Sequence, residues 1–193
     1  MGRFAGLALD NTQAYPSRMA QRSTRLGPHD WLAAGRSALC DAGPSALKAE
    51  PLAVRLGVSK GSFYWHFRDV PAFQDILLSE WETDAVSRAA RTDGTPVAQL
   101  RALAQDLADP DPTDRAVRSW AQGHDGARAA VERVDTARIT LLHELLRETG
   151  IANPEMARIV YAAAVGMTAL DRTGPSDNRN AMGSLVDLVL ALR

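Results

Sequence analysis

The sequence is poor in several residue types, and each scarcity excludes a class of protein. Cys40 is the one cysteine among 193 residues, so no disulfide can form within the chain, and we interpret it as a small buried hydrophobe. Aromatic residues make up only 6% and runs of β-branched residues are missing, which argues against a fold built of strands. The sequence has no uninterrupted apolar run of about 18 residues, and its first residues carry no apolar run of the signal-peptide type. These absences favour an all-α protein that works in the cytoplasm and makes no contact with a membrane.

Charge is unevenly distributed along the chain. Residues 1–68 hold nine Lys and Arg against four Asp and Glu, a net charge of +5 in a chain whose net charge is −1, so residues 69–193 carry −6. A basic first third joined to an acidic remainder favours contact between the first part and a polyanion such as DNA. Metal-binding spacings of the HExxH or CxxC type, phosphate-binding loops and catalytic pairs are absent. We therefore expect no metal, no cofactor and no enzymatic activity.

Turn-forming residues divide the chain into an arm and nine expected helices. Residues 1–26 lack periodicity and are expected to form a flexible basic arm, whose Arg22 and Arg25 are candidates for contact with a minor groove. Residues 27–68 hold three helices, the first stopped by Gly43 and the third running from Ser59 to about Phe67. Residues 69–193 hold the other six, beginning with a long helix over about 70–91, and form a larger helical domain.

A helix-turn-helix pattern occupies residues 50–67. Ala53 is small enough to lie where two helices cross, and four residues later Gly57 supplies the positive φ that a tight turn requires. Val58 can fill the core beneath the turn, and Ser59 can cap the helix that follows. The sequence therefore predicts two short helices locked at a fixed angle, an arrangement typical of DNA-binding proteins.

The third helix turns Phe63 and Phe67 inward and its remaining residues outward. Three consecutive aromatic residues are unlikely on a surface that only faces solvent. Tyr, His and Ser can bond phosphate oxygens, and Trp can pack on a sugar or a thymine methyl. The outward residues, which we expect to contact DNA, are Lys60, Gly61, Ser62, Tyr64, Trp65 and His66.

The twelve residues from Leu56 to Phe67, LGVSKGSFYWHF, resemble the recognition-helix signature of the TetR family of repressors, and the resemblance extends over about residues 28–78. It implies a three-helix DNA-binding domain, a larger helical domain that holds a small-molecule effector, and a homodimer formed through the last two helices. It also implies DNA contacts at the outward residues named above. The lysine usual at the start of the fourth helix is Val70 here, so Arg68 is expected to take over that phosphate contact; Lys48 and Ser59 complete the expected DNA-binding set.

The same resemblance implies an effector cavity in the larger domain. The expected lining is mainly apolar, which predicts an apolar or aromatic effector, and it consists of Leu77, Trp81, Leu103, Trp120, Leu142, His143 and Tyr161. The last two helices present long apolar faces, on which Ala162 and Gly166 would let another helix approach closely. The expected dimer contacts are Ala162, Gly166, Leu185, Leu188 and Val189. A two-fold dimer predicts a palindromic double-stranded operator.

Two other interpretations stay open at this point. The larger domain could dock a protein partner in place of a small molecule, or the chain could be an all-helical enzyme whose first domain merely resembles a DNA-binding module. Salt-sensitive binding to duplex DNA separates both regulator hypotheses from the enzyme, and a ligand screen separates the two regulators.

Overall fold

The computed structural model describes residues 26–90, 93–170 and 175–191 of the chain. Its regular structure within these ranges is helical throughout, which confirms the predicted all-α fold. The helices are α1 (Pro28–Ala42), the 3₁₀ turn η1 (Pro44–Ala46), α2 (Ala49–Leu56), α3 (Lys60–Phe63), α4 (Val70–Arg88), α5 (Pro96–Leu107), α6 (Pro112–Trp120), α7 (Asp125–Glu148), α8 (Pro154–Thr168) and α9 (Pro175–Leu190). None of the helices in the described ranges combines the length and the apolar character needed to cross a lipid bilayer.

Local sequence accounts for most helix starts. Proline occupies the first position of α1, α5, α6 and α8, where its missing N–H leaves no intrahelical bond unmade. A side-chain oxygen just before the helix accepts a backbone N–H at α4, α5, α6 and α8; these caps are Asp69, Thr95, Asp111 and Asn153. The breakers that divide the sequence therefore lie where the helices begin.

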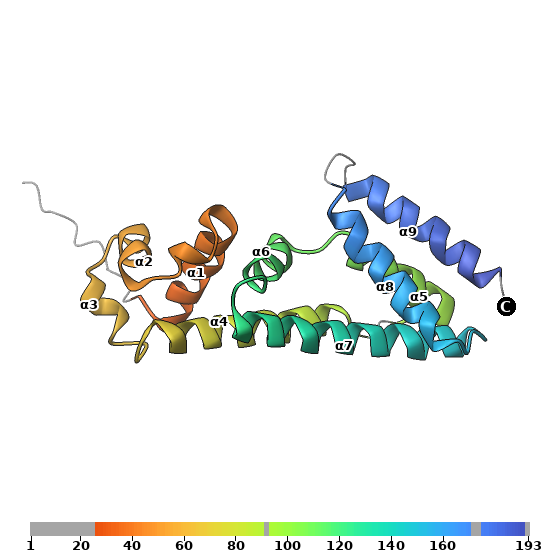
Figure 1. Cartoon of the computed structure of the whole chain (residues 1–193), viewed down its shortest axis with the longest axis horizontal. Coiled ribbons are helices and arrows are strands. Elements are labelled where there is room, and N and C mark those ends of the chain that lie inside the picture. The colour runs from red at the N-terminus through yellow and green to blue at the C-terminus, as the bar shows by residue number, and fades with distance from the viewer. Residues whose placement is uncertain (1–25, 91–92, 171–174, 192–193) are drawn as a thin grey trace, which may run out of the picture.

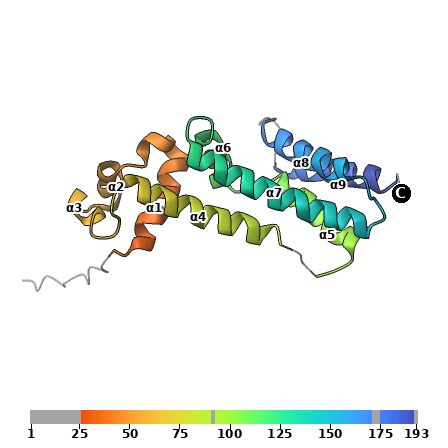
Figure 2. The same cartoon turned by 60° about the horizontal axis from the view of Figure 1, so that its bottom comes forward.

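The helices are arranged along one long axis (Figures 1 and 2). α1, α2 and α3 gather at one end as a head, and α4 leaves the head to run beside α7. α5, α8 and α9 pack together with α7 at the other end, which we call the body. α6 lies between the two and packs on α1, α4 and α7.

Two clusters of buried residues hold the molecule together. The head core contains Trp31, Leu32, Leu39, Leu47, Leu52, Phe63, Phe67, Phe73, Leu77, Leu78, Trp81, Val117, Trp120 and Val134, with smaller residues between them. The body core contains Leu100, Leu103, Leu107, Leu142, Leu145, Leu146, Val160, Tyr161, Met182, Val186 and Val189. α7 contributes to both clusters, and α4 reaches from the head core at Ala85 to the body core at its C-cap Ala89, so both helices connect the two cores.

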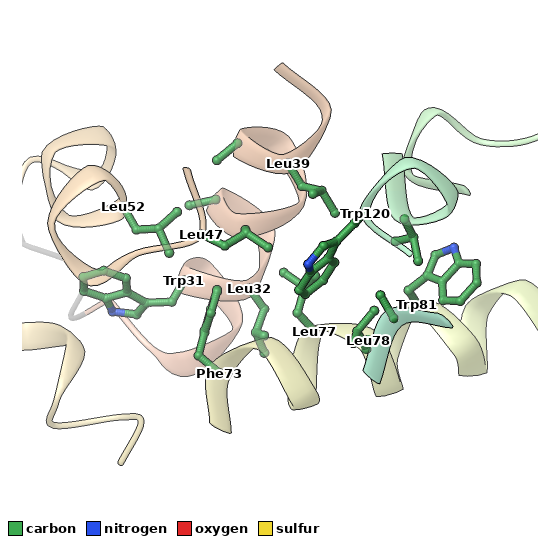
Figure 3. Packing of buried hydrophobic residues seen from close by; sticks show 14 of the residues in the cluster. Trp31, Leu32, Leu39, Leu47, Leu52, Phe73, Leu77, Leu78, Trp81 and Trp120 are labelled. Carbon is green, nitrogen blue, oxygen red and sulfur yellow. The ribbon is translucent and has the colours of Figure 1, made fainter. Parts of the chain in front are cut away.

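Aromatic side chains fill the centre of the head core. Phe63 of α3 meets Trp31 of α1 and Phe73 of α4 edge to face, each at a ring-centroid distance of 5.4 Å. Figure 3 shows the indole of Trp120 reaching toward Leu39 of α1 and Leu77 of α4. Because Trp120 comes from α6, the core of the head includes residues far beyond position 68 in the sequence.

Three sequence-based expectations need correction. Cys40 is exposed, because it lies off the buried face of α1, with its Sγ 3.9 Å from the hydroxyl oxygen of Thr113 in α6. α3 ends at Phe63 and not near Phe67; the chain continues through a hydrogen-bonded turn, in which the N–H groups of His66 and Phe67 both bond the carbonyl of Phe63. Ser59 occupies the N-cap position of α3, but its hydroxyl makes no capping bond. The expected arm, with Arg22 and Arg25, lies outside the described residues apart from Leu26.

Candidate nucleic-acid interface

A tight turn fixes α3 against α2. Gly57 ends α2 at φ 68° and ψ 30°, the left-handed conformation that a residue with a side chain rarely adopts. The N–H of Val58 bonds the carbonyl of Ala53 at 3.0 Å, which closes the turn, and Ala53 is buried at the crossing. The helix-turn-helix predicted from residues 50–67 is therefore present, and its angle is set by backbone bonds.

The outer surface of α3 and of the following turn is aromatic. The Trp65 side chain is 86% exposed and Tyr64 is 50% exposed, whereas Phe63 and Phe67 are buried beneath them. Phe63 supports Tyr64 directly, with ring centroids 5.3 Å apart and nearly perpendicular planes. A tryptophan this exposed buries little apolar surface within the folded chain, so its surface is available to a partner.

Basic, small and hydroxylated residues complete this surface. Lys60, Gly61 and His66 are exposed, and Ser62 is half-buried at the edge of the helix. The hydroxyl of the exposed Ser59 makes no capping bond, which leaves a hydrogen-bonding group beside the first turn of α3. All six outward residues predicted from the sequence thus lie on one accessible surface, together with Ser59.

Two lysines flank a groove between α2 and α3. The groove is lined by Lys48, Ala49, Glu50, Pro51, Val54, Lys60, Tyr64 and Val70. The Nζ of Lys60 lies 3.9 Å from a carboxylate oxygen of Glu50, at the outer limit of an ion pair. Such an exposed pair contributes little, so Lys60 can exchange it for a phosphate.

Arg68 stands at the start of α4, beside the position where Val70 replaces the expected lysine. Its Nε donates to a carboxylate oxygen of Asp69 at 2.8 Å, and the other oxygen of Asp69 accepts the N–H of Ala72. The bond from Ala72, followed by that from Arg68, lowers the pKa of Asp69. Arg68 is therefore held close to the end of the recognition element by the residue that caps α4.

Two other arginines of the head are engaged inside the protein. Arg36 of α1 bridges to Glu80 at 3.0 Å and to Asp84 at 2.8 Å, and so ties α1 to α4. Arg55 of α2 pairs with Asp41 at the end of α1. The Lys and Arg residues within residues 26–68 thus divide into a structural part, Arg36 and Arg55, and an exposed part, Lys48, Lys60 and Arg68.

The comparisons with known proteins agree with this geometry. Residues 32–69 match the model of the bacterial regulatory proteins of the tetR family. The tetracycline repressor protein class A from transposon 1721 of Escherichia coli is 30% identical over 161 residues, which cover 80% of this chain and 71% of that protein. The chain belongs to the TetR family. It is a DNA-binding transcriptional regulator, as the recognition-helix signature predicted.

Solved structures of TetR-family and other regulators share the fold at low sequence identity. A transcriptional regulator from Rhodococcus sp. Rha1 superposes with a TM-score of 0.71 at 21% identity, over 86% of this chain and 97% of that one. The reduced form of NemR from E. coli gives 0.67 at 17% identity over 84% and 96%. SmeT, the repressor of the Stenotrophomonas maltophilia multidrug efflux pump SmeDEF, gives 0.61 at 18% identity over 86% and 90%. At these identities the likeness shows the fold alone.

The residues expected to line one effector cavity are divided between the two cores of this TetR-family regulator. Leu77, Trp81 and Trp120 lie in the head core, whereas Leu103, Leu142 and Tyr161 lie in the body core. His143 is half-buried on α7. A cavity of about 460 Å³ does lie between the end of α4, α5, the start of α6 and α7, but Leu103 alone of the expected residues lines it.

Tyr161 belongs to a network of buried and half-buried ions that sequence reasoning missed. Its hydroxyl donates to Asp135 at 2.6 Å and accepts from Arg118 at 2.7 Å. Arg118 also binds Asp114 at 3.0 Å, and Asp114 in turn binds Arg138 at 3.0 Å. Burial raises the pKa of Tyr161 to about 12, so its hydroxyl stays protonated and keeps its donor role. The network joins α6, α7 and α8.

The expected dimer residues differ in their accessibility. Ala162 and Gly166 are exposed on α8, and Leu188 of α9 is 62% exposed. Ile159 and Leu170, which sequence reasoning did not select, add exposed apolar surface on and just after α8. Leu185 is half-buried, and Val189 is only 3% exposed because it packs in the body core. A change at Val189 therefore tests the fold of one subunit, not contact between subunits.

Proposed function

We propose that this TetR-family regulator is a homodimeric repressor that binds a palindromic DNA site through α3 and leaves the site when a small molecule binds in the body. The proposal rests chiefly on the exposed Trp65 and Tyr64 above the fully buried Phe63. The relative named a tetracycline repressor supports the repressor role. No reaction is assigned to the chain, and its proposed place of action is the cytoplasm, where the DNA lies.

The proposed DNA-binding domain is residues 27–68, and residues 69–193 hold the effector and the dimer contacts. We assign Lys48, Lys60 and Tyr64, with Ser59 and Arg68, mainly to phosphate, and Ser62 and Trp65 to base edges. Gly61 allows close approach to the duplex, and His66 faces the same surface. The exposed faces of α8 and α9 are proposed to pair across the two-fold axis as a four-helix bundle.

Release requires that effector and DNA prefer different arrangements of the two heads. The heads of a dimer must meet successive major grooves about 34 Å apart. α4 begins directly after the recognition element and borders the 460 Å³ cavity with Ala85, Arg88 and Ala89 near its end. An effector that shifts α4 would change the spacing of the heads. The free energy by which it favours the shifted form cannot exceed the difference between its binding free energies for the two forms.

Replacement of single residues on α3 tests the DNA interface. Lys60→Ala and Tyr64→Ala should weaken binding to every duplex, because phosphate contacts carry no sequence information. Since both subunits of the proposed dimer lose the contact, Lys60→Ala should lower the salt dependence by about two units of slope. Ser62→Ala and Trp65→Ala should change the preferred sequence, by about 1–3 kcal/mol per affected base pair. Fluorescence anisotropy on duplexes selected from a random pool measures both effects.

Arg147→Ala provides the matched control, because Arg147 is exposed near the far end of α7. It should leave affinity and salt dependence unchanged. Undiminished affinity of both Lys60→Ala and Tyr64→Ala at moderate salt would mean that another surface binds DNA.

A further inference from the structure

α6 is a nine-residue helix between head and body, and it is held from two sides (Figure 1). Val117 and Trp120 enter the head core, where Trp120 reaches toward Leu39 of α1 (Figure 3). Asp114 and Arg118, one turn apart on the same helix, bind side chains of α7 and α8 instead. The two sides differ in kind, because the contacts with the head core are apolar and those with α7 and α8 are ionic or polar.

The ionic side fixes α6 along and around its own axis. Asp114 binds Arg138 of α7 at 3.0 Å, and Arg118 binds Asp135, one turn earlier on α7, through two nitrogen–oxygen pairs at 2.5 and 3.2 Å. A shift of α6 by one turn, or a rotation about its axis, would separate both pairs. Buried ion pairs add little net stability over well-packed apolar residues, and their best-attested role is to select one register.

Tyr161 connects this register to α8. Its hydroxyl donates to Asp135 at 2.6 Å and accepts from Arg118 at 2.7 Å, so it bonds both members of that ion pair. Tyr161 is only 5% exposed, on the inner side of α8, whereas the next residue, Ala162, is exposed on the outer side. That outer side is the surface proposed to meet the second subunit. Tyr161 therefore lies between the proposed dimer contact and the helix that reaches the head.

We propose that Tyr161 is a positioning residue for DNA binding: through Arg118 and Asp135 it fixes α6 relative to α8, and so helps to set the separation and orientation of the two heads in the dimer. The inference rests on the proposed function, because it requires a homodimer that binds two half-sites of one duplex. The residues of α3 decide which bases are read, whereas Tyr161 decides how strictly the spacing of the half-sites is selected. α4 also connects head and body, so Tyr161 sharpens the spacing and does not determine it alone.

The spacing of the half-sites is the property that separates a positioning role from a stabilising one. One inserted base pair moves the half-sites apart by about 3.4 Å and rotates one against the other by about 35°. A rigid pair of heads binds one spacing well, and a looser pair tolerates the neighbouring spacings. A residue that only stabilises the fold would lower the free energy of unfolding and leave the preference for one spacing unchanged.

The experiment compares duplexes that differ only in this spacing. We would select a duplex from a random pool with the parent protein, and then insert or delete one base pair at its centre. Fluorescence anisotropy gives the spacing ratio, the Kd for an altered duplex divided by the Kd for the selected one. Tyr161→Phe removes the hydroxyl and keeps the ring, so it should reduce the spacing ratio at least about threefold, the effect of losing a hydrogen bond to a charged group. The preferred bases within each half-site should stay the same.

Arg101→Gln is the matched control, because it removes an exposed ion pair with Asp187 between α5 and α9, outside the network. It should leave the spacing ratio unchanged. If Tyr161→Phe fails to fold, Asp135→Asn takes its place: the amide oxygen can still accept from Tyr161, but the ion pair with Arg118 is lost. The spacing ratio should fall in that variant as well.

The outcomes distinguish the inference from the proposed function. A spacing ratio in Tyr161→Phe equal to that of the parent would overturn the inference, even if the variant is less stable to urea. A parent that binds all three spacings equally would overturn it too, and so would an equal fall of the ratio in Arg101→Gln. Undiminished DNA affinity of Lys60→Ala and Tyr64→Ala would instead contradict the proposed interface, and it would do so whatever the spacing ratio of Tyr161→Phe.

Discussion

At the scale of single residues, Gly35 shows how closely α1 and α4 approach each other. A Cβ atom at position 35 would lie 2.6 Å from Cζ of Phe73 and 2.8 Å from Cδ1 of Leu77, and both of these side chains are fully buried. Gly35→Ala should therefore lower the free energy of unfolding by about 1–3 kcal/mol, although alanine is the better helix former. Urea unfolding followed by circular dichroism measures this difference.

Gly123→Ala is the matched control, because its Cβ would meet no atom within 4 Å and its φ is not positive. It should leave the unfolding midpoint nearly unchanged. A Gly35→Ala protein as stable as the parent would mean that α1 moves away from α4 at no cost.

Residue-scale features also mark the limit of prediction from sequence. Gly57, Val58 and the inward pair Phe63 and Phe67 could be placed because their roles depend on neighbours within a few positions. Asp114 and Arg138 could not, because charged residues are usually exposed and only their pairing across α6 and α7 makes burial tolerable. No local pattern signals a partner 24 residues away.

At the scale of secondary structure, helix starts were predictable and one helix end was not. A capping residue followed by proline predicts the starts of α5, α6 and α8 from the sequence. The end of α3 at Phe63 was missed, because Tyr64 to His66 form a turn whose bonds resemble those of a helix and no breaker precedes Phe67. The predicted outward face survives this difference, since the turn keeps the same residues on the surface.

The exposed faces of α8 and α9 carry the prediction about assembly. Leu188→Asp places a charge on apolar surface that a dimer would bury, and burying an unpaired carboxylate is strongly unfavourable. The parent should sediment as a dimer at micromolar concentration, whereas Leu188→Asp should sediment as a folded monomer or aggregate. Analytical ultracentrifugation distinguishes these states.

Val54→Asp is a suitable control, because Val54 is also an exposed apolar residue, on α2 of the head. It should remain dimeric even though it disturbs the groove beside Lys60. A monomeric parent, or a Leu188→Asp protein that dimerises like the parent, would show that α8 and α9 do not form the interface.

At the scale of the whole molecule, the head and the body are not joined by a simple linker. α4 and α7 run side by side along the long axis, and the head core takes side chains from α4, α6 and α7 (Figures 1 and 2). The ion pairs of Arg36 with Glu80 and Asp84 add a second connection between α1 and α4. A displacement of α4 or α6 would therefore reach α1 through packed side chains, which have few alternative arrangements.

This shared core leads to a prediction for a truncated chain. A fragment of residues 1–68 keeps the proposed DNA-binding domain but loses Phe73, Leu77 and Trp120, so Trp31 and Phe63 would face water. With so few residues left to bury apolar surface, the fragment should show low helicity by circular dichroism and no cooperative thermal transition, whereas the full chain should show one. A fragment with the helical content expected for α1 to α3 and with the DNA affinity of the full chain would contradict this prediction. That result would mean that residues 27–68 fold without the rest of the chain and that α4 and α6 add little to the stability of the head. An unfolded fragment would instead mean that α3 keeps its place only while α4 and α6 cover the head core, so that a shift of either helix would reach the proposed DNA contacts.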